Sequence, residues 1–234
     1  VVGDLTGFAA ATYLRGIDFI QMPTTLLSQV DSSIGGKTGV DFLQYKNMVG
    51  AFYMPRMVYI NIHSLLSLPN LQFASGMGEI IKHGLIRDAS YYQWLKDHQA
   101  AIQAHDEDIL EEMVYGSCLI KKNVVETDPK EQGIRAYLNF GHTIGHAIEK
   151  MSDFSLYHGQ CVAIGMHSGA YLSFKRGHIT KDQYEDILAM IQGFDLPVSV
   201  SDYDAGEILA NTKSDNGTSG STNNRNNGAD SRTS

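Results

Sequence analysis

The distribution of proline is the sequence feature that most constrains the fold of this chain. Pro23, Pro55 and Pro69 interrupt its first third, whereas no proline occurs between Pro129 and Pro197. Proline lacks a backbone donor and clashes with the preceding turn of a helix. A proline-free stretch of this length, rich in Ala, Ile, Leu, Met and Glu, therefore favours long helices. The same argument predicts shorter elements in the first third.

The first 70 residues alternate between helix-like, strand-like and loop-like segments. Residues 4–14 form a plausible helix, and residues 17–22 and 58–62 are short strand-like runs rich in β-branched and aromatic side chains. Between the two runs, residues 35–39 have the composition of a loop. Alternation of this kind predicts an α/β architecture for residues 1–70.

The rest of the packed chain is predicted to be a mainly helical domain, residues 71–205. Apolar side chains recur at helical spacing over residues 106–125. Helices are also expected over 78–86, 91–104, 141–151, 159–175 and 180–191, the last with a capping box at Thr180 and Gln183. Small and polar residues dominate 206–234, and most of all 211–234, so we expect this end to be a disordered tail.

The composition argues against several classes of protein. There are 18 basic and 26 acidic residues, a net charge of −8, which disfavours general nucleic-acid binding. Cys118 and Cys161 are far apart in the sequence, which argues against a disulfide scaffold or a thiolate zinc site. No apolar run reaches the roughly 18 residues of a membrane span. We therefore expect a cytoplasmic protein with neither a nucleic-acid nor a membrane partner.

Two stretches of the α/β part could bind an anion. Gly3-Asp4 follows two valines and precedes a predicted helix, and such a strand–glycine–helix junction presents free N–H groups that could meet a phosphate. A plain βα turn is the simpler interpretation of this pair. Residues 24–39 are rich in hydroxyls and glycines and include Lys37. They do not match the P-loop pattern, because Asp31 stands where its first glycine should be. This stretch suits an anionic ligand or is a solvated loop.

Glu79 has Lys82 at i+3 and His83 at i+4 on a predicted helix. We interpret this group as an ion pair on a solvated face; the alternative is a metal-binding carboxylate with basic neighbours.

The histidines indicate a ligand site more strongly. His142 and His146 share one helix face, and Thr143 stands where zinc proteases have Glu, which disfavours protease chemistry. His158 begins another predicted helix. One Glu and two His would leave open metal positions for substrate oxygens. Three cations could hold a phosphate or carboxylate beside them: Lys82, Lys121 and Arg135.

Taken together, these motifs resemble the 3-dehydroquinate synthase family from Val1 to about Asp204. The matching segments are residues 1–4, 23–39, 46–47 (Lys-Asn), 76–83 (Gly-Met-Gly-Glu-Ile-Ile-Lys-His), 138–146 (Leu-Asn-Phe-Gly-His-Thr-Ile-Gly-His) and 158–159 (His-Gly). The resemblance implies an α/β, Rossmann-like NAD-binding domain, of which residues 1–70 would be an N-terminal remnant. A mainly α-helical metal-binding domain would follow it.

The resemblance also implies site residues by motif position. The zinc or cobalt ligands would be Glu79, His142 and His158. The NAD site would include Gly3, Asp4, Thr24, Thr25, Lys37 and Lys46. The substrate, a phosphorylated seven-carbon keto acid, would contact Asp31, Asn47, Lys82, Lys121, Arg135, Asn139 and His146. In a homodimer, Arg15 would reach the neighbouring subunit's site.

The implied reaction converts 3-deoxy-D-arabino-heptulosonate 7-phosphate to 3-dehydroquinate and phosphate in the shikimate pathway. It proceeds by transient oxidation by NAD, phosphate elimination, reduction and an intramolecular aldol step. The segment that precedes Val1 in the family is absent, and Asn216 follows Asp215 where the family has a phosphate-binding Lys. We therefore expect a truncated chain that binds metal, binds NAD weakly and turns over poorly. The alternatives are a related sugar-phosphate cyclase such as 2-deoxy-scyllo-inosose synthase, an iron-containing alcohol dehydrogenase, or an inactive remnant.

Overall fold

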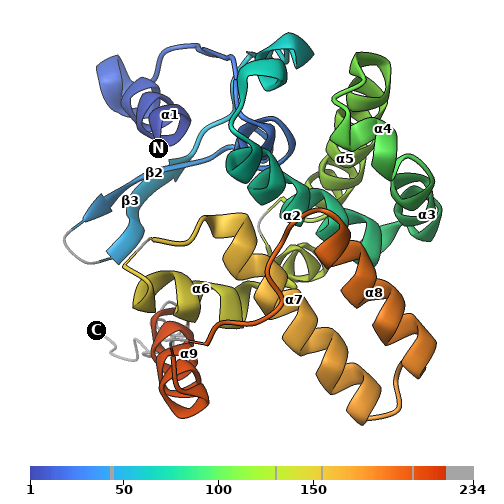
Figure 1. The fold of residues 1–234 in the computed structure, drawn as a ribbon. Coiled ribbons are helices and arrows are strands. Elements are labelled where there is room, and N and C mark those ends of the chain that lie inside the picture. Colours follow the sequence, from blue (N-terminus) through green and yellow to red (C-terminus); the bar gives the residue numbers. More distant parts are fainter. Residues whose placement is uncertain (43–44, 130, 154, 202, 220–234) are drawn as a thin grey trace, which may run out of the picture.

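One enclosed helix organises the computed structural model, which describes residues 1–42, 45–129, 131–153, 155–201 and 203–219. This helix, α2 (Asn70–Arg87), is buried at every position from Phe73 to Gly84. Other helices pack around it (Figure 1): α3 (Ala89–Asp97), α5 (Glu107–Thr127), α7 (His158–Lys175) and α8 (Lys181–Gly193). The main hydrophobic core is centred on α2, with Met77, Ile80 and Ile81 fully buried.

The described part of residues 1–70 combines one α-helix, three short 3₁₀ or π-helical segments and two small pairs of strands. Strands β1 (Ile20–Gln21) and β4 (Met57–Val58) pair in parallel. Strands β2 (Lys37–Phe42) and β3 (Tyr45–Phe52) form an antiparallel hairpin, and α1 (Val2–Thr12) packs against β2. The hairpin extends to one side of the helical body (Figure 1). The predicted mixture of helix and short strands is confirmed at this coarse level.

Two local predictions in this part were wrong. Lys37, Thr38 and Gly39 belong to β2 and not to a loop, because β3 supplies hydrogen-bonding partners that the composition of residues 35–39 did not reveal. Gly3 and Asp4 lie inside the first turn of α1, so they do not form a strand–glycine–helix junction.

Most helices after residue 70 follow the sequence predictions, but α2 begins at Asn70, eight residues before the expected start at residue 78. α3 and α4 (Gln99–Gln103) divide the helix expected over 91–104. The side chain of Asp106 caps α5 by accepting a hydrogen bond from the Ile109 N–H at 3.2 Å. The capping box of α8 has both of its hydrogen bonds, between Thr180 and Gln183. In the described part of the chain, none of the helices is both long and apolar enough to cross a bilayer.

The prediction of a disordered tail from residue 206 was wrong for the first part of that segment. Residues of that segment form α9 (Ala205–Ser219), which packs against α6 (His142–Met151). Ile208 contacts a small core cluster that includes Ile148 and Cys161, so the first turns of α9 bury apolar surface before the polar composition takes over. Residues 220–234 lie outside the described residues.

Glycines allow α7 to approach its two neighbours at backbone distance. A Cβ atom on Gly159 would lie 1.8 Å from the carbonyl oxygen of Ser75 in α2. A Cβ atom on Gly165 would lie 1.9 Å from the carbonyl oxygen of Gly141, at the start of α6. Because both obstacles are backbone atoms, rotation of a side chain cannot relieve either clash. These contacts fix the separation of α7 from α2 and α6.

We predict that Gly159→Ala destabilises the fold by about 3 kcal/mol, the upper range for overpacking, because α2 and α7 must separate to admit the methyl group. Thermal or urea unfolding measures the change. Gly206→Ala is the matched control: its nearest obstacle is the exposed Asp204 side chain, at 2.8 Å. That variant should be neutral or slightly more stable, since Ala is the better helix former. Equal unfolding free energies for the two variants would contradict the backbone contact.

Candidate metal centre and surrounding site

Side chains from three separate helices meet where α2, α6 and α7 come together. The Nε2 atoms of His142 and His158 lie 3.6 Å and 3.4 Å from Oε1 of Glu79. One donor atom from each of these residues lies within 4.8 Å of the other two. Glu79 Oε1 is buried and lacks a hydrogen-bond partner within the described residues. A carboxylate oxygen and two imidazole nitrogens converging in this way fit a divalent metal such as zinc.

Burial and charge act in opposite directions on these three groups. Burial favours the neutral form of Glu79, but Lys82 and the two histidines hold its pKa well below the usual value. Burial and the nearby Lys82 charge lower the pKa of His142 to about 4. Burial would also lower the pKa of His158, but Glu149 and Glu79 raise it to about 10. The carboxylate of Glu79 is therefore fully buried, whereas the side chains of His142 and His158 keep 15% and 24% exposure.

The ion pair of Glu79 with Lys82 forms as expected, but its predicted place on a solvated face was wrong. The Glu79 and Lys82 side chains are 0% and 1% exposed. The helical spacing indicated the pair correctly; it did not show that α2 is enclosed by other helices. His83, next along, is also buried: its Nδ1 lies 2.8 Å from Ser117 Oγ, and burial lowers its pKa to about 3.

Asp31 joins the α/β part to this cluster. Its carboxylate and its backbone carbonyl both contact the ammonium group of Lys121. One of its carboxylate oxygens also lies within 4.8 Å of donor atoms of Glu79 and His83. Burial would raise the pKa of Asp31, but Lys121, with a smaller effect from Lys82, lowers it. Two ion pairs, Glu79–Lys82 and Asp31–Lys121, therefore lie next to each other beside the histidines.

Glu131 is a residue that the sequence reasoning missed. It forms an ion pair with Lys37 of β2 and accepts a hydrogen bond from Asn139 Nδ2 at 3.2 Å. It thus connects a predicted NAD residue with a predicted substrate residue. No spacing pattern could have revealed it, because Lys37 and Glu131 are 94 positions apart. Nearby, the buried Arg135 donates to the carbonyls of Pro129 and Gly35.

His146 and Glu149 extend the His142 face of α6. The rings of His146 and His142 meet edge to face, with their centroids 5.1 Å apart, and His146 is exposed. Glu149 is buried, and its Oε2 lies 3.6 Å from Nδ1 of His158. Sequence reasoning assigned Glu149 no role, although its position three residues after His146 places it on the same helix face.

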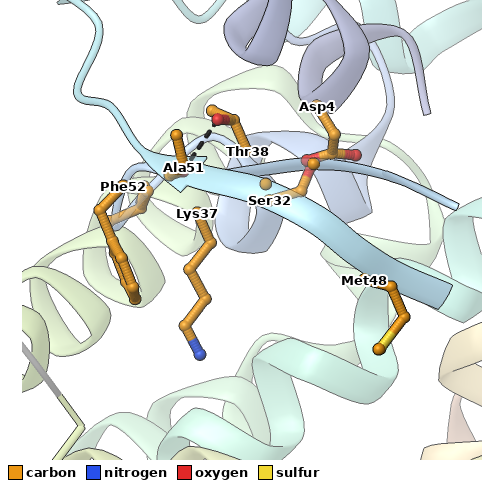
Figure 2. A pocket seen from close by; sticks show the side chains of 10 residues that line it. Asp4, Ser32, Lys37, Thr38, Met48, Ala51 and Phe52 are labelled. Carbon is orange, nitrogen blue, oxygen red and sulfur yellow. Dashed lines mark hydrogen bonds between the residues drawn. The ribbon is translucent and has the colours of Figure 1, made fainter. Parts of the chain in front are cut away.

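Five of the six residues predicted to bind NAD line two cavities that share a lining residue. Asp4 and Lys37 line one of about 470 Å³, and Gly3, Thr24 and Thr25 line another of about 480 Å³. Ser32, which follows Asp31, lines both. Figure 2 shows Lys37 and Met48 pointing away from one side of the hairpin and Asp4 on the other side.

Three predicted residues are not brought to the cluster by the described contacts. Lys46 and Asn47 lie in β3, and their side chains are outside the described residues. Arg15 is exposed in the turn that follows α1 (Tyr13–Arg15), with a φ of 70°.

Comparison with solved structures identifies the fold. One neighbour is ValA, a 2-epi-5-epi-valiolone synthase from Streptomyces hygroscopicus subsp. jinggangensis solved with NAD⁺ and Zn²⁺. It matches with a TM-score of 0.84 and 25% identity over 90% of this chain and 59% of that one. A 2-deoxy-scyllo-inosose synthase in complex with carbaglucose-6-phosphate, NAD⁺ and Co²⁺ matches with a TM-score of 0.82 and 27% identity, over 90% and 58% of the two chains.

Curated relatives at higher identity carry a different name. A 3-dehydroquinate synthase of Syntrophotalea carbinolica is 52% identical over 87% of this chain and 56% of its own length. The one of Acetivibrio thermocellus is 46% identical, over 89% and 58%. The chain thus spans a little over half the length of these relatives. Family models also match, 3-dehydroquinate synthase N-terminal over residues 1–75 and 3-dehydroquinate synthase C-terminal over residues 76–217. On this evidence, the chain belongs to the 3-dehydroquinate synthase family.

Proposed function

We propose that this chain carries the metal- and substrate-binding part of a 3-dehydroquinate synthase, together with part of its NAD-binding α/β domain in residues 1–70. The observation that carries the proposal is the convergence of Glu79, His142 and His158, with a buried Glu79 oxygen directed at both histidines. The identity of about half to the curated synthases supports the choice of reaction within the fold.

The three donors would hold zinc or cobalt, and the α/β part would hold NAD. When bound, NAD would supply reversible hydride transfer at a secondary alcohol of the substrate, and the metal would polarise the oxygen of that alcohol and lower its pKa. The two cavities that share Ser32, the residue after Asp31, would accommodate the dinucleotide. The assigned NAD residues are Gly3, Asp4, Thr24, Thr25, Lys37 and Lys46.

The cations beside the donors would bind the phosphate and carboxylate of the substrate. Lys82 pairs with Glu79, and Lys121 pairs with Asp31, so both ammonium groups are already held in place and mostly stripped of water. A metal ion bound to Glu79 would weaken the attraction of this carboxylate for Lys82. The ammonium group of Lys82 would then be available to bind an anionic group of the substrate. Fixing a phosphate at one end and a carboxylate at the other restricts the substrate to a reactive geometry.

The remaining assignments complete the proposed site. Arg135, Asn139, His146, Asp31 and Asn47 would contact the substrate, with Arg135 suited to a bidentate hold on an oxyanion. Glu131 would orient Lys37 and Asn139 through the contacts described above. We place the enzyme in the shikimate pathway, as a cytoplasmic homodimer in which the exposed Arg15 reaches the partner's site.

A related sugar-phosphate cyclase is the second candidate. Both solved neighbours named above are such cyclases, and one was solved with carbaglucose-6-phosphate. Their identities of 25% and 27% are well below the 52% and 46% of the curated 3-dehydroquinate synthases, which favours the first candidate.

We predict that Glu79→Ala abolishes stoichiometric metal binding, because it removes the only carboxylate oxygen aimed at both histidines in the described part of the site. Equilibrium dialysis followed by metal analysis should show one zinc per wild-type chain and almost none in the variant. The control is Glu107→Ala, an exposed glutamate paired with His63 at 2.8 Å, which should keep its zinc. A full equivalent of zinc in Glu79→Ala would contradict the ligand assignment.

A chimera tests the reaction itself. Residues 1–204 of this chain replace the matching part of the Syntrophotalea carbinolica relative. The chimera should release phosphate from 3-deoxy-D-arabino-heptulosonate 7-phosphate, measured colorimetrically, without net NADH. Adding Glu79→Ala should slow it by on the order of 100-fold or more, because a bound metal contributes several kcal/mol of transition-state stabilisation.

The substrate panel decides between the candidates. Phosphate release from glucose 6-phosphate instead would favour the related cyclase, and net NADH formation would indicate a dehydrogenase. A folded chimera that releases phosphate from neither substrate would refute the proposed function.

A further inference from the structure

His158 stands between two buried carboxylates. Its Nε2 lies 3.4 Å from Oε1 of Glu79, and its Nδ1 lies 3.6 Å from Oε2 of Glu149. Both glutamates are buried, Glu79 at 0% and Glu149 at 8% exposure. The two nitrogens of an imidazole are chemically distinct, and the partner of one determines what the other can do.

The fold fixes Glu149 in this position. His142, His146 and Glu149 lie along one face of α6, which is the face turned toward the first turn of α7. Next to Glu149, Ile148 packs in a small core cluster with Cys161 and Ile164 of α7. The close contact of Gly165 with Gly141 then sets the separation of the two helices. The packing of α6 against α7 therefore places Glu149 at a buried position.

A buried carboxylate in such a place needs a partner, because removing an unpaired charge from water is costly. The Nδ1 of His158, at the start of α7, lies 3.6 Å from the Glu149 carboxylate. A histidine that binds a metal through Nε2 must carry its proton on Nδ1, and an acceptor at Nδ1 selects that tautomer.

We propose that Glu149 is a positioning residue that accepts the Nδ1 proton of His158 and so directs the Nε2 lone pair of His158 toward Glu79 and the metal. This inference rests on the proposed function, since it concerns the same metal. Glu149 itself does not touch the metal or the substrate. It acts by fixing the tautomer and the ring orientation of one ligand.

A competing possibility is a second metal. Donor atoms of His146, Glu149 and His158 also lie within 4.8 Å of one another. With Nε2 of His158 directed at Glu79, a second cation would have to take the nitrogen that faces Glu149. A proton and a metal cannot occupy that nitrogen together, so metal stoichiometry separates the two cases.

The experiment measures metal affinity in the full chain. Zn²⁺ or Co²⁺ is titrated into wild type, Glu149→Gln and Glu149→Asp in competition with a chelator, and the Co²⁺ absorption spectrum is recorded. Glu149→Gln should weaken binding by about 10- to 100-fold, the usual effect of losing such an outer partner, and alter the Co²⁺ spectrum. Glu149→Asp should recover part of the loss. Stoichiometry should stay at one, and Glu126→Gln, an exposed glutamate of α5, should behave as wild type.

A measurement on the wild-type chain keeps the test decisive if the variants fold poorly. Nitrogen-15 NMR of the zinc-bound chain should show the His158 proton on Nδ1. Unchanged affinity in Glu149→Gln, a proton absent from Nδ1, or two metals per wild-type chain falling to one in the variant would each overturn the inference. Glu79→Ala keeps the two proposals apart. If it loses metal while Glu149→Gln does not, only the role of Glu149 fails; if wild type binds no metal, the proposed function fails.

Discussion

The site depends on the contact between the backbones of α2 and α7. Gly159 lies against the Ser75 carbonyl, and its N–H donates to Ser75 Oγ at 3.0 Å. His158 directly precedes Gly159, and Glu79 is one helical turn beyond Ser75, so the glycine brings the carboxylate and the imidazole to the same place. Any side chain at position 159 would push the two donors apart. The same close contact between α2 and α7 therefore determines both the packing of the helices and the distance between Glu79 and His158.

The helix at the centre of this architecture also places charged side chains in the protein interior. α2 is buried from Phe73 to Gly84, yet that stretch contains Glu79, Lys82 and His83. Hydrophobic side chains of similar volume would often stabilise a core at least as well as a buried ion pair does. The Glu79 carboxylate pairs with Lys82 and the Asp31 carboxylate pairs with Lys121, and this pairing lowers the pKa of both carboxyl groups. Such an interior is explained more simply by ligand binding than by stability.

Much of the helical part could be predicted from local sequence, because its signals are local. The Asp106 cap, the Thr180–Gln183 box and the helical spacing in α5 involve residues a few positions apart. The β2–β3 hairpin could not be predicted this way, since Gly-Gly-Lys-Thr-Gly has the composition of a turn and becomes a strand only beside β3. The start of α9 was missed because its apolar residues are few and depend on contact with α6.

In the site, too, features that depend on nearby residues could be predicted, whereas features that depend on distant contacts could not. The sequence indicated that His142 and His146, at i and i+4, share a helix face and that Glu79 and Lys82, at i and i+3, could pair. It did not indicate that Lys82 is buried. Glu131 depends on a contact across 94 positions. The assignment of Glu79, His142 and His158 as a set came from resemblance, and the geometry is compatible with it.

The three donors also lie far apart along the chain. A cation held by Glu79, His142 and His158 would join α2, α6 and α7 and close two loops of the polypeptide, one of them long. Because the unfolded chain does not bring these side chains together, occupancy would stabilise only the folded state. The free energy of unfolding would then increase with the concentration of free metal, so the fraction of folded chain would depend on how much metal is available.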